Sequence, residues 1–129
     1  MAELSLEPYA AVQRWRLSPA AGSPEALLAE YLEALARNCQ AAGECVIGHI
    51  KALALFPERG YLRISAVAAD LPATLDGAAP PGCDRLEVAL NVLVYGLPRE
   101  RIEHIVRQTA QSLAQERQIE VSTGPAADR

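Results

Sequence analysis

The segment Arg85–Tyr95 (RLEVALNVLVY) alternates between aliphatic and mixed side chains over its whole length. The first parity is entirely aliphatic and comprises Leu86, Val88, Leu90, Val92 and Val94. The second parity mixes charged, amide and apolar side chains and comprises Arg85, Glu87, Ala89, Asn91, Leu93 and Tyr95. A period of two residues predicts a strand with one face against a core. Such a strand needs pairing partners and a second layer over its apolar face, so the fold must contain a covered sheet.

Two segments near the ends of the chain show the same alternation in a weaker form. In Tyr9–Leu17, one parity is apolar except for Gln13, and the other parity carries basic residues. Near the end of the chain, Ile119 and Val121 share one parity. We therefore predict a first strand over Tyr9–Leu17 and a short last strand around Ile119.

Residues 44–56 are ambiguous between helix and strand. The positions that would form a helical stripe are Val46, Ile47, Ile50, Leu53 and Ala54. However, several of these residues are β-branched, Gly48 interrupts the segment, and the turn-forming stretch 57–60 (PERG) follows it. Residues 61–69 then alternate, and a hairpin accounts for both halves together. We therefore predict strands rather than a helix on both sides of this turn.

Two segments have the pattern of amphipathic helices. Ser23 can cap a helix that has Pro24 at its first position, and Gly43 is a suitable end. The apolar stripe of this helix is Leu27, Leu28, Tyr31, Leu32, Leu35 and Cys39. A second helix is predicted to follow the turn at residues 96–98 (GLP), with a stripe of Ile102, Ile105, Val106, Thr109 and Leu113.

The predicted order is strand, helix, three strands, helix and strand. It indicates an α+β fold, a two-layer sandwich with two helices on one face of a mostly antiparallel sheet of about five strands. This architecture is similar to a ferredoxin-like split βαβ arrangement with an extra strand. Residues 1–122 are expected to form a single domain, with 123–129 as a frayed C-terminal tail. The Pro- and Gly-rich stretch 71–83 is expected to be a long loop, either mobile or functional.

Composition narrows the possible environments and partners. The chain has 129 residues and a net charge of −4, and its basic runs are short, which argues against nucleic-acid binding. We expect the basic runs 14–16 and 99–101 to be solvated. The first residues do not resemble a signal peptide, no apolar stretch is long enough to span a membrane, and three cysteines is an odd number. These features predict a cytoplasmic protein with free thiols.

The sheet face turned away from the helices is the most informative candidate surface. It is predicted to carry His49 and Lys51 on one strand, with Ile47, Leu53 and Leu55 beside them. The candidate ligand-binding or interface residues on this face are His49, Lys51, Arg63, Glu87, Asn91 and Tyr95. Such a face can be half of a homodimer interface, an ordinary solvated surface, or a site for a small anionic ligand.

Metal and cofactor sites are not expected. Cys45 and His49 have a spacing that would suit a metal on a helix, but on a strand they stand roughly 13 Å apart. Cys39 lies on an apolar stripe and is expected in the core, while Cys83 in the long loop has no identified base beside it. His104 falls outside the stripe of its helix and is expected at the surface.

Searches for catalytic motifs find neither a phosphate-binding glycine loop nor a nucleophile elbow. The leading hypothesis is therefore a non-enzymatic domain that associates, as a homodimer, through its open sheet face. The alternatives are a small enzyme or a metabolite-binding sensor that uses the same face. In the enzyme, His49 would act as acid or base, Lys51 or Arg63 would stabilise negative charge, and Tyr95 would orient the substrate.

Overall fold

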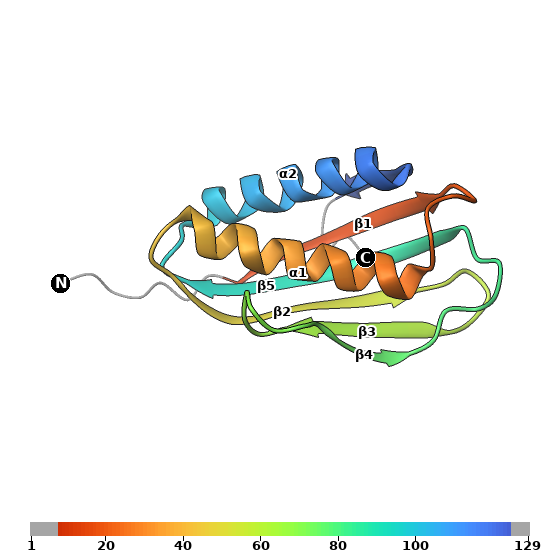
Figure 1. Ribbon diagram of the computed structural model, residues 1–129, viewed down its shortest axis with the longest axis horizontal. Helices are drawn as coiled ribbons and strands as arrows, with labels where there is room; N and C mark the ends of the chain where they lie inside the picture. Colours follow the sequence, from red (N-terminus) through yellow and green to blue (C-terminus); the bar gives the residue numbers. More distant parts are fainter. Residues whose placement is uncertain (1–7, 125–129) are drawn as a thin grey trace.

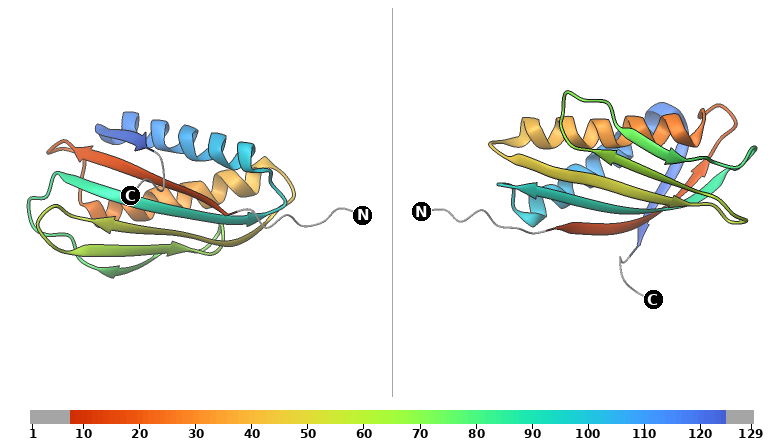
Figure 2. Two further views of the ribbon diagram at one scale, coloured as in Figure 1. Left: turned by 180° about the vertical axis from the view of Figure 1, so that it is seen from behind. Right: turned by 90° about the horizontal axis from the view of Figure 1, so that it is seen from below.

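The computed structural model describes residues 8–124 and shows a two-layer α+β sandwich (Figure 1). The strands are β1 (Tyr9–Leu17), β2 (Val46–Leu55), β3 (Tyr61–Ala66), β4 (Thr74–Gly77), β5 (Arg85–Tyr95) and β6 (Ile119–Gly124). The helices are α1 (Pro24–Ala42) and α2 (Arg99–Arg117). The single sheet has the order β4-β3-β2-β5-β1-β6, and every neighbouring pair is antiparallel. Both helices lie on the same side of this sheet, as the further views in Figure 2 also show.

Strand β5 lies in the interior of the sheet. It pairs with β1 on one side and with β2 on the other. Because both of these strands are antiparallel to β5, they run parallel to each other, and helix α1 connects them. Helix α2 likewise leads from β5 to β6, with β1 lying between those two strands. The strong alternation of β5 therefore belongs to a strand that is paired along both edges.

Helix α1 begins and ends where the sequence predicts. The Ser23 hydroxyl accepts a hydrogen bond from the Ala26 amide at 3.1 Å, which satisfies one of the free amides of the first turn. Gly43 follows the last helical residue. The predicted stripe is fully buried against the sheet, together with Ala36.

The exception in the alternation of β1, Gln13, is part of the core. Its side chain is 0 % exposed. Gln13 Nε2 donates a hydrogen bond to the Tyr31 hydroxyl at 2.8 Å, and its Oε1 accepts one from Trp15 Nε1 at 3.0 Å. The rings of Trp15 and Tyr31 pack edge to face, with centroids 5.4 Å apart. Gln13 thus follows the inward parity of β1 because these partners replace the water it loses.

The sheet has six strands rather than about five, because β4 lies inside the predicted loop 71–83. This strand pairs with β3 at the edge of the sheet, and all of its side chains are exposed. Helix α1 holds the backbone on both sides of it: the Glu33 carboxylate accepts from the Ala73 amide at 2.9 Å, and Glu25 accepts from Ala79 at 3.0 Å. A short edge strand with no buried face has no alternation from which to predict it.

Smaller differences concern where strands end. The choice of a strand over a helix for residues 44–56 is confirmed by β2. Strand β3 ends at Ala66, before Val67, and β6 continues to Gly124, into residues expected to form the tail. Residues 125–129 of that tail lie outside the described part of the chain. Within residues 8–124, neither helix combines the length and the apolar character needed to cross a membrane.

Candidate functional site

The side chains that point away from the helices form a surface that we call the open face. Its arrangement follows from the strand register, since directly paired residues of antiparallel strands point to the same side. One row across the sheet joins Val12 of β1, Ala89 of β5, Leu53 of β2 and Arg63 of β3. Successive rows along the strands are therefore neighbours on one continuous surface.

The candidate residues chosen from the sequence all fall in register positions of this face. Lys51 pairs directly with Asn91, and His49 pairs with Leu93 in the next row. Among residues 8–124, the side chains of His49 and Lys51 form no hydrogen bond or ion pair. Tyr95 pairs with Val46 one step further along, at the end of the sheet.

Ile47 does not belong to this face, contrary to its expected parity. The pairing of β2 with β5 shifts between Ile47 and His49, which leaves Gly48 as a bulge. Before the bulge, Ile47 pairs with Val94 and packs against the core, while Val46 turns outward and is 61 % exposed. A side chain at Gly48 would meet the Leu93 carbonyl oxygen at 3.1 Å and the Tyr95 ring at 3.2 Å.

Two of the candidate residues are held away from the others by their own partners. The Arg63 guanidinium lies 3.6 Å from Asp76 of β4 and 4.9 Å from the centre of the Tyr61 ring. Glu87 lies 4.0 Å from Arg14 of β1. The open face therefore does not bring the candidate cations, the histidine and the carboxylate together in one cluster.

The centre of the open face is apolar. Val12, Ala89 and Leu53 form one row across β1, β5 and β2, and Leu93 lies two rows away along β5, beyond Lys51 and Asn91. Each of these four apolar side chains is partly exposed. Leu55 and Tyr61 continue the apolar surface toward β3 and are exposed. We use the name apolar belt for Val12, Leu53, Ala89 and Leu93. Charged and amide side chains border the belt at both ends of the strands.

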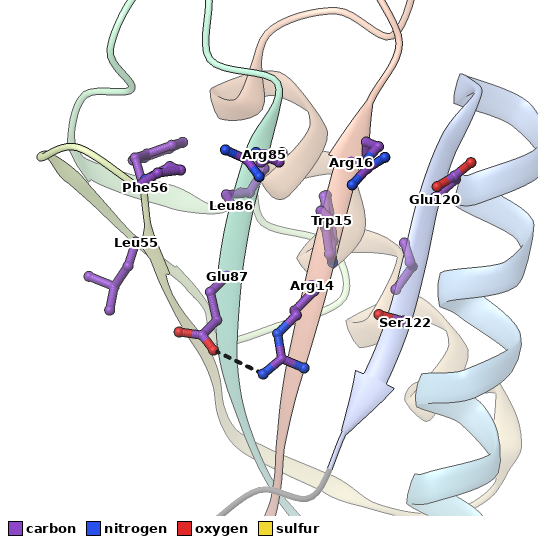
Figure 3. A pocket seen from close by; sticks show the side chains of 12 residues that line it. Arg14, Trp15, Arg16, Leu55, Phe56, Arg85, Leu86, Glu87, Glu120 and Ser122 are labelled. Atoms are coloured by element: carbon purple, nitrogen blue, oxygen red, sulfur yellow. Dashed lines mark ion pairs between the residues drawn. The ribbon is translucent and has the colours of Figure 1, made fainter. Parts of the chain in front are cut away.

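One end of the open face carries a group of arginines that the sequence did not single out. Arg16 of β1 pairs directly with Arg85 of β5, and Arg14 lies in the adjacent row opposite Glu87. Figure 3 shows these side chains around a cavity of about 630 Å³, with Glu120 of β6 beside Arg16. Arg14 and Arg16 are exposed, as expected, but their proximity to Arg85 requires the register of β1 on β5. None of His49, Lys51, Arg63 and Asn91 lines this cavity.

The thiols of the first helix and of the segment after it are unsuited to nucleophilic chemistry. Burial raises the pKa of Cys39 to about 12, and the nearby Cys45 adds to this shift. Burial also raises the pKa of Cys45, whose thiol donates a hydrogen bond to the Cys39 carbonyl at 3.3 Å. In the described part of the chain, no three His, Cys, Asp or Glu side chains come together as a metal site.

Comparison with the models of known protein families, with curated protein sequences and with solved structures gave no match. Any assignment of function to this chain therefore depends on its residues and their geometry.

Proposed function

We propose that this protein functions by association with a second copy of itself, through the open face. The single observation that carries the proposal is the apolar belt, which runs across the three strands at the middle of the sheet. The row of Val12, Ala89 and Leu53 continues into the neighbouring pair of Leu55 and Tyr61, and contiguous apolar surface of this kind commonly marks an interaction site. Two antiparallel sheets that pack face to face would cover both belts with each other's side chains.

The size of the open face suits a dimer of ordinary stability. Six strands spaced about 4.8 Å apart, with a length of about 33 Å for ten residues, outline at most roughly 800 Å². Stable protein interfaces bury about 800 Å² on each partner. A dimer of ordinary stability would therefore need contact over nearly the whole of the face.

The distribution of charge on the open face supports a partner with the same surface. An apolar centre with a polar border is the usual anatomy of an interface. Each edge region carries both signs, with Arg63 and Asp76 on β3 and β4, and Arg16 and Glu120 on β1 and β6. A twofold axis parallel to the strands would lay one edge region over the other, so that groups of both signs would lie at each border of the interface.

The enzyme hypothesis has less support. His49 and Lys51 lie in neighbouring rows, but they do not line the arginine cavity, and Arg63 is already paired with Asp76. A general acid or base acts within hydrogen-bond reach of its substrate, which usually needs a concave site.

Two finer features belong to the same proposal. The strands β2-β5-β1-β6 and the two helices would form a ferredoxin-like unit, to which β3 and β4 add a hairpin at the edge. Two connections support the ferredoxin-like unit. In β1-α1-β2 the two strands are separated in the sheet by β5, and in β5-α2-β6 they are separated by β1. A cytoplasmic location is supported by the free state of all three cysteines.

Sedimentation equilibrium with substitutions in the belt tests the association. Leu53→Arg and Leu93→Arg would each place a charge within the proposed interface, whereas Gln111→Arg adds the same charge to an exposed site on α2. We expect dimers for the wild type and for Gln111→Arg, and monomers with a retained circular dichroism spectrum for the belt variants. A wild type that stays monomeric at high micromolar concentration, or belt variants that dimerise equally well, would refute the proposal.

A further inference from the structure

The arginine end of the open face contains two like charges in direct opposition. Arg16 and Arg85 are paired residues of adjacent antiparallel strands, where side chains lie closest to each other. Like charges in this position destabilise a sheet unless something neutralises them. Within residues 8–124, no hydrogen bond or ion pair engages either guanidinium.

Carboxylates near these arginines provide only part of the missing negative charge. Glu87 lies 4.0 Å from Arg14, at the limit of an ion pair. Glu120 pairs in register with Arg16, without an ion pair between their side chains. The three arginines and two carboxylates around the cavity therefore leave an excess of one positive charge.

The cavity beside the arginines has room for a small organic molecule. Its volume of about 630 Å³ lies within the range of ligand sites. Leu55 and Phe56 lie on one side of it, at the end of β2, and the arginines lie across β5 and β1 (Figure 3). Pro57, which follows Phe56, also lines the cavity. The cavity thus offers an apolar wall on one side and guanidinium groups on the other.

We propose that this cavity binds a small phosphate monoester, with the phosphate at Arg16 and Arg85 and the organic group against Leu55, Phe56 and Pro57. The planar guanidinium can donate two parallel hydrogen bonds to phosphate oxygens, and a phosphate monoester is close to a dianion at neutral pH. A phosphate between the two opposed cations would offer hydrogen-bond acceptors to both of them. This ligand site is formed within one copy of the chain and goes beyond the proposed dimerisation. It lies at the end of the open face that full contact between two copies would cover, so the ligand and a second copy would compete for it.

Isothermal titration calorimetry with phenyl phosphate and with inorganic phosphate tests the site. We expect saturable binding of phenyl phosphate to the wild-type protein, several-fold tighter than that of inorganic phosphate because the ring contacts the apolar wall. Arg16→Gln and Arg85→Gln should each weaken phenyl phosphate binding by about 10- to 100-fold, as expected for the loss of charge-assisted hydrogen bonds. Arg37→Gln, at an exposed position on α1, is the matched control and should bind like the wild type.

The variants should fold, because each removes one of two repelling charges. Without ligand, the thermal midpoint of Arg85→Gln should equal or exceed that of the wild type. Phenyl phosphate should raise the midpoints of the wild type and of Arg37→Gln by more than that of Arg85→Gln. Equal binding by the wild type and by the Arg16→Gln/Arg85→Gln double variant would overturn the proposal. So would equal affinity for inorganic phosphate, or tighter binding of a phosphodiester oligonucleotide than of phenyl phosphate.

Discussion

The two faces of the sheet are built from the same strands, yet their side chains differ in how far they are buried. On the helix side of β5, Val88 and Leu90 are at most 1 % exposed and pack beneath the helices. On the other side of the same strand, Ala89 and Leu93 are only partly covered, and Arg85 is exposed at the end. On the helix side, the two helices of the same chain cover the apolar side chains. The open face has partly exposed apolar side chains at its centre and charged side chains at its border.

Polar groups show the contrast most clearly. On the helix side, the Gln13 amide is fully enclosed and hydrogen-bonds to Tyr31 and Trp15. On the open face, Arg16 and Arg85 oppose each other without a partner among residues 8–124. A buried polar group must be satisfied within the fold, while groups on an open surface remain able to bind something else. We therefore expect substitutions on the helix side to affect mainly stability, and substitutions on the open face to affect mainly the binding that we propose for it.

The largest expected effect compares two leucines on opposite faces. Leu90→Ala should lower the free energy of unfolding by about 2–5 kcal/mol, because it leaves a cavity in a closed core. Leu53→Ala, in the next strand but on the open face, should cost less than half as much at low micromolar concentration. Urea denaturation of both variants measures the difference. Equal losses would show that the two faces are equally buried in the single chain.

A second comparison uses two amide side chains. Gln13→Ala should lower the free energy of unfolding by roughly 2–4 kcal/mol, since it creates a cavity and leaves Tyr31 and Trp15 without their partner. Asn91→Ala, on the open face opposite Lys51, should change it by less than about 0.5 kcal/mol. The same denaturation experiment applies. A small effect of Gln13→Ala would mean that water replaces the lost hydrogen bonds.

The buried thiol of Cys39 provides a pH test of the closed face. Its pKa rises from 9.0 in the unfolded chain to about 12 in the fold, so the thiol stays protonated to a higher pH in the folded state. The contribution of this group to the free energy of unfolding is fully present below pH 9.0 and is lost as the pH rises toward 12. At one pH unit above the pKa of the unfolded chain, the free energy of unfolding should be lower by roughly 1.4 kcal/mol.

The variant Cys39→Ala lacks the titrating thiol and is therefore the control for the wild-type protein. The free energy of unfolding, measured by urea denaturation at several alkaline pH values, should fall less steeply for the variant than for the wild type. Parallel pH profiles would indicate that Cys39 is accessible to solvent in the folded protein.

The smallest expected effect concerns the edge of the open face. Arg63→Gln removes the 3.6 Å ion pair with Asp76, in which both side chains are mostly exposed. Exposed ion pairs contribute little because water screens them, so the change in the free energy of unfolding should stay below about 0.5 kcal/mol. Urea denaturation checks this value. A loss above 1 kcal/mol would show that the edge of the open face is more enclosed than the structure indicates.

The sequence predicted those parts of the fold that have a buried face. Alternation identified β1, β3, β5 and β6, and helical stripes identified α1 and α2, because burial imposes a period on the side chains. Strand β2 was identified instead from its β-branched residues and the turn that follows it. Strand β4 was missed because its side chains are exposed on both sides. The bulge at Gly48 reversed the parity of Ile47, since one extra residue exchanges the faces of a strand.

The arrangement of the candidate residues on the open face could be predicted only in part, for a different reason. Parity correctly placed His49, Lys51 and Asn91 on one face, because it depends on each strand alone. It could not show that Arg16 of β1 lies opposite Arg85 of β5, since these residues are distant in the sequence and meet only through the register. A site assembled across strands needs the pairing as well as the pattern.

The most direct test of this division between faces is an isotope-filtered NMR experiment on a mixture of labelled and unlabelled protein. It detects contacts between the methyl groups of different copies. We predict intermolecular contacts from the methyl groups of Val12, Leu53 and Leu93 on the open face, and none from Leu28 or Leu90 in the closed core. Absence of intermolecular contacts at high micromolar concentration, or contacts confined to the surfaces of α1 and α2, would contradict the account.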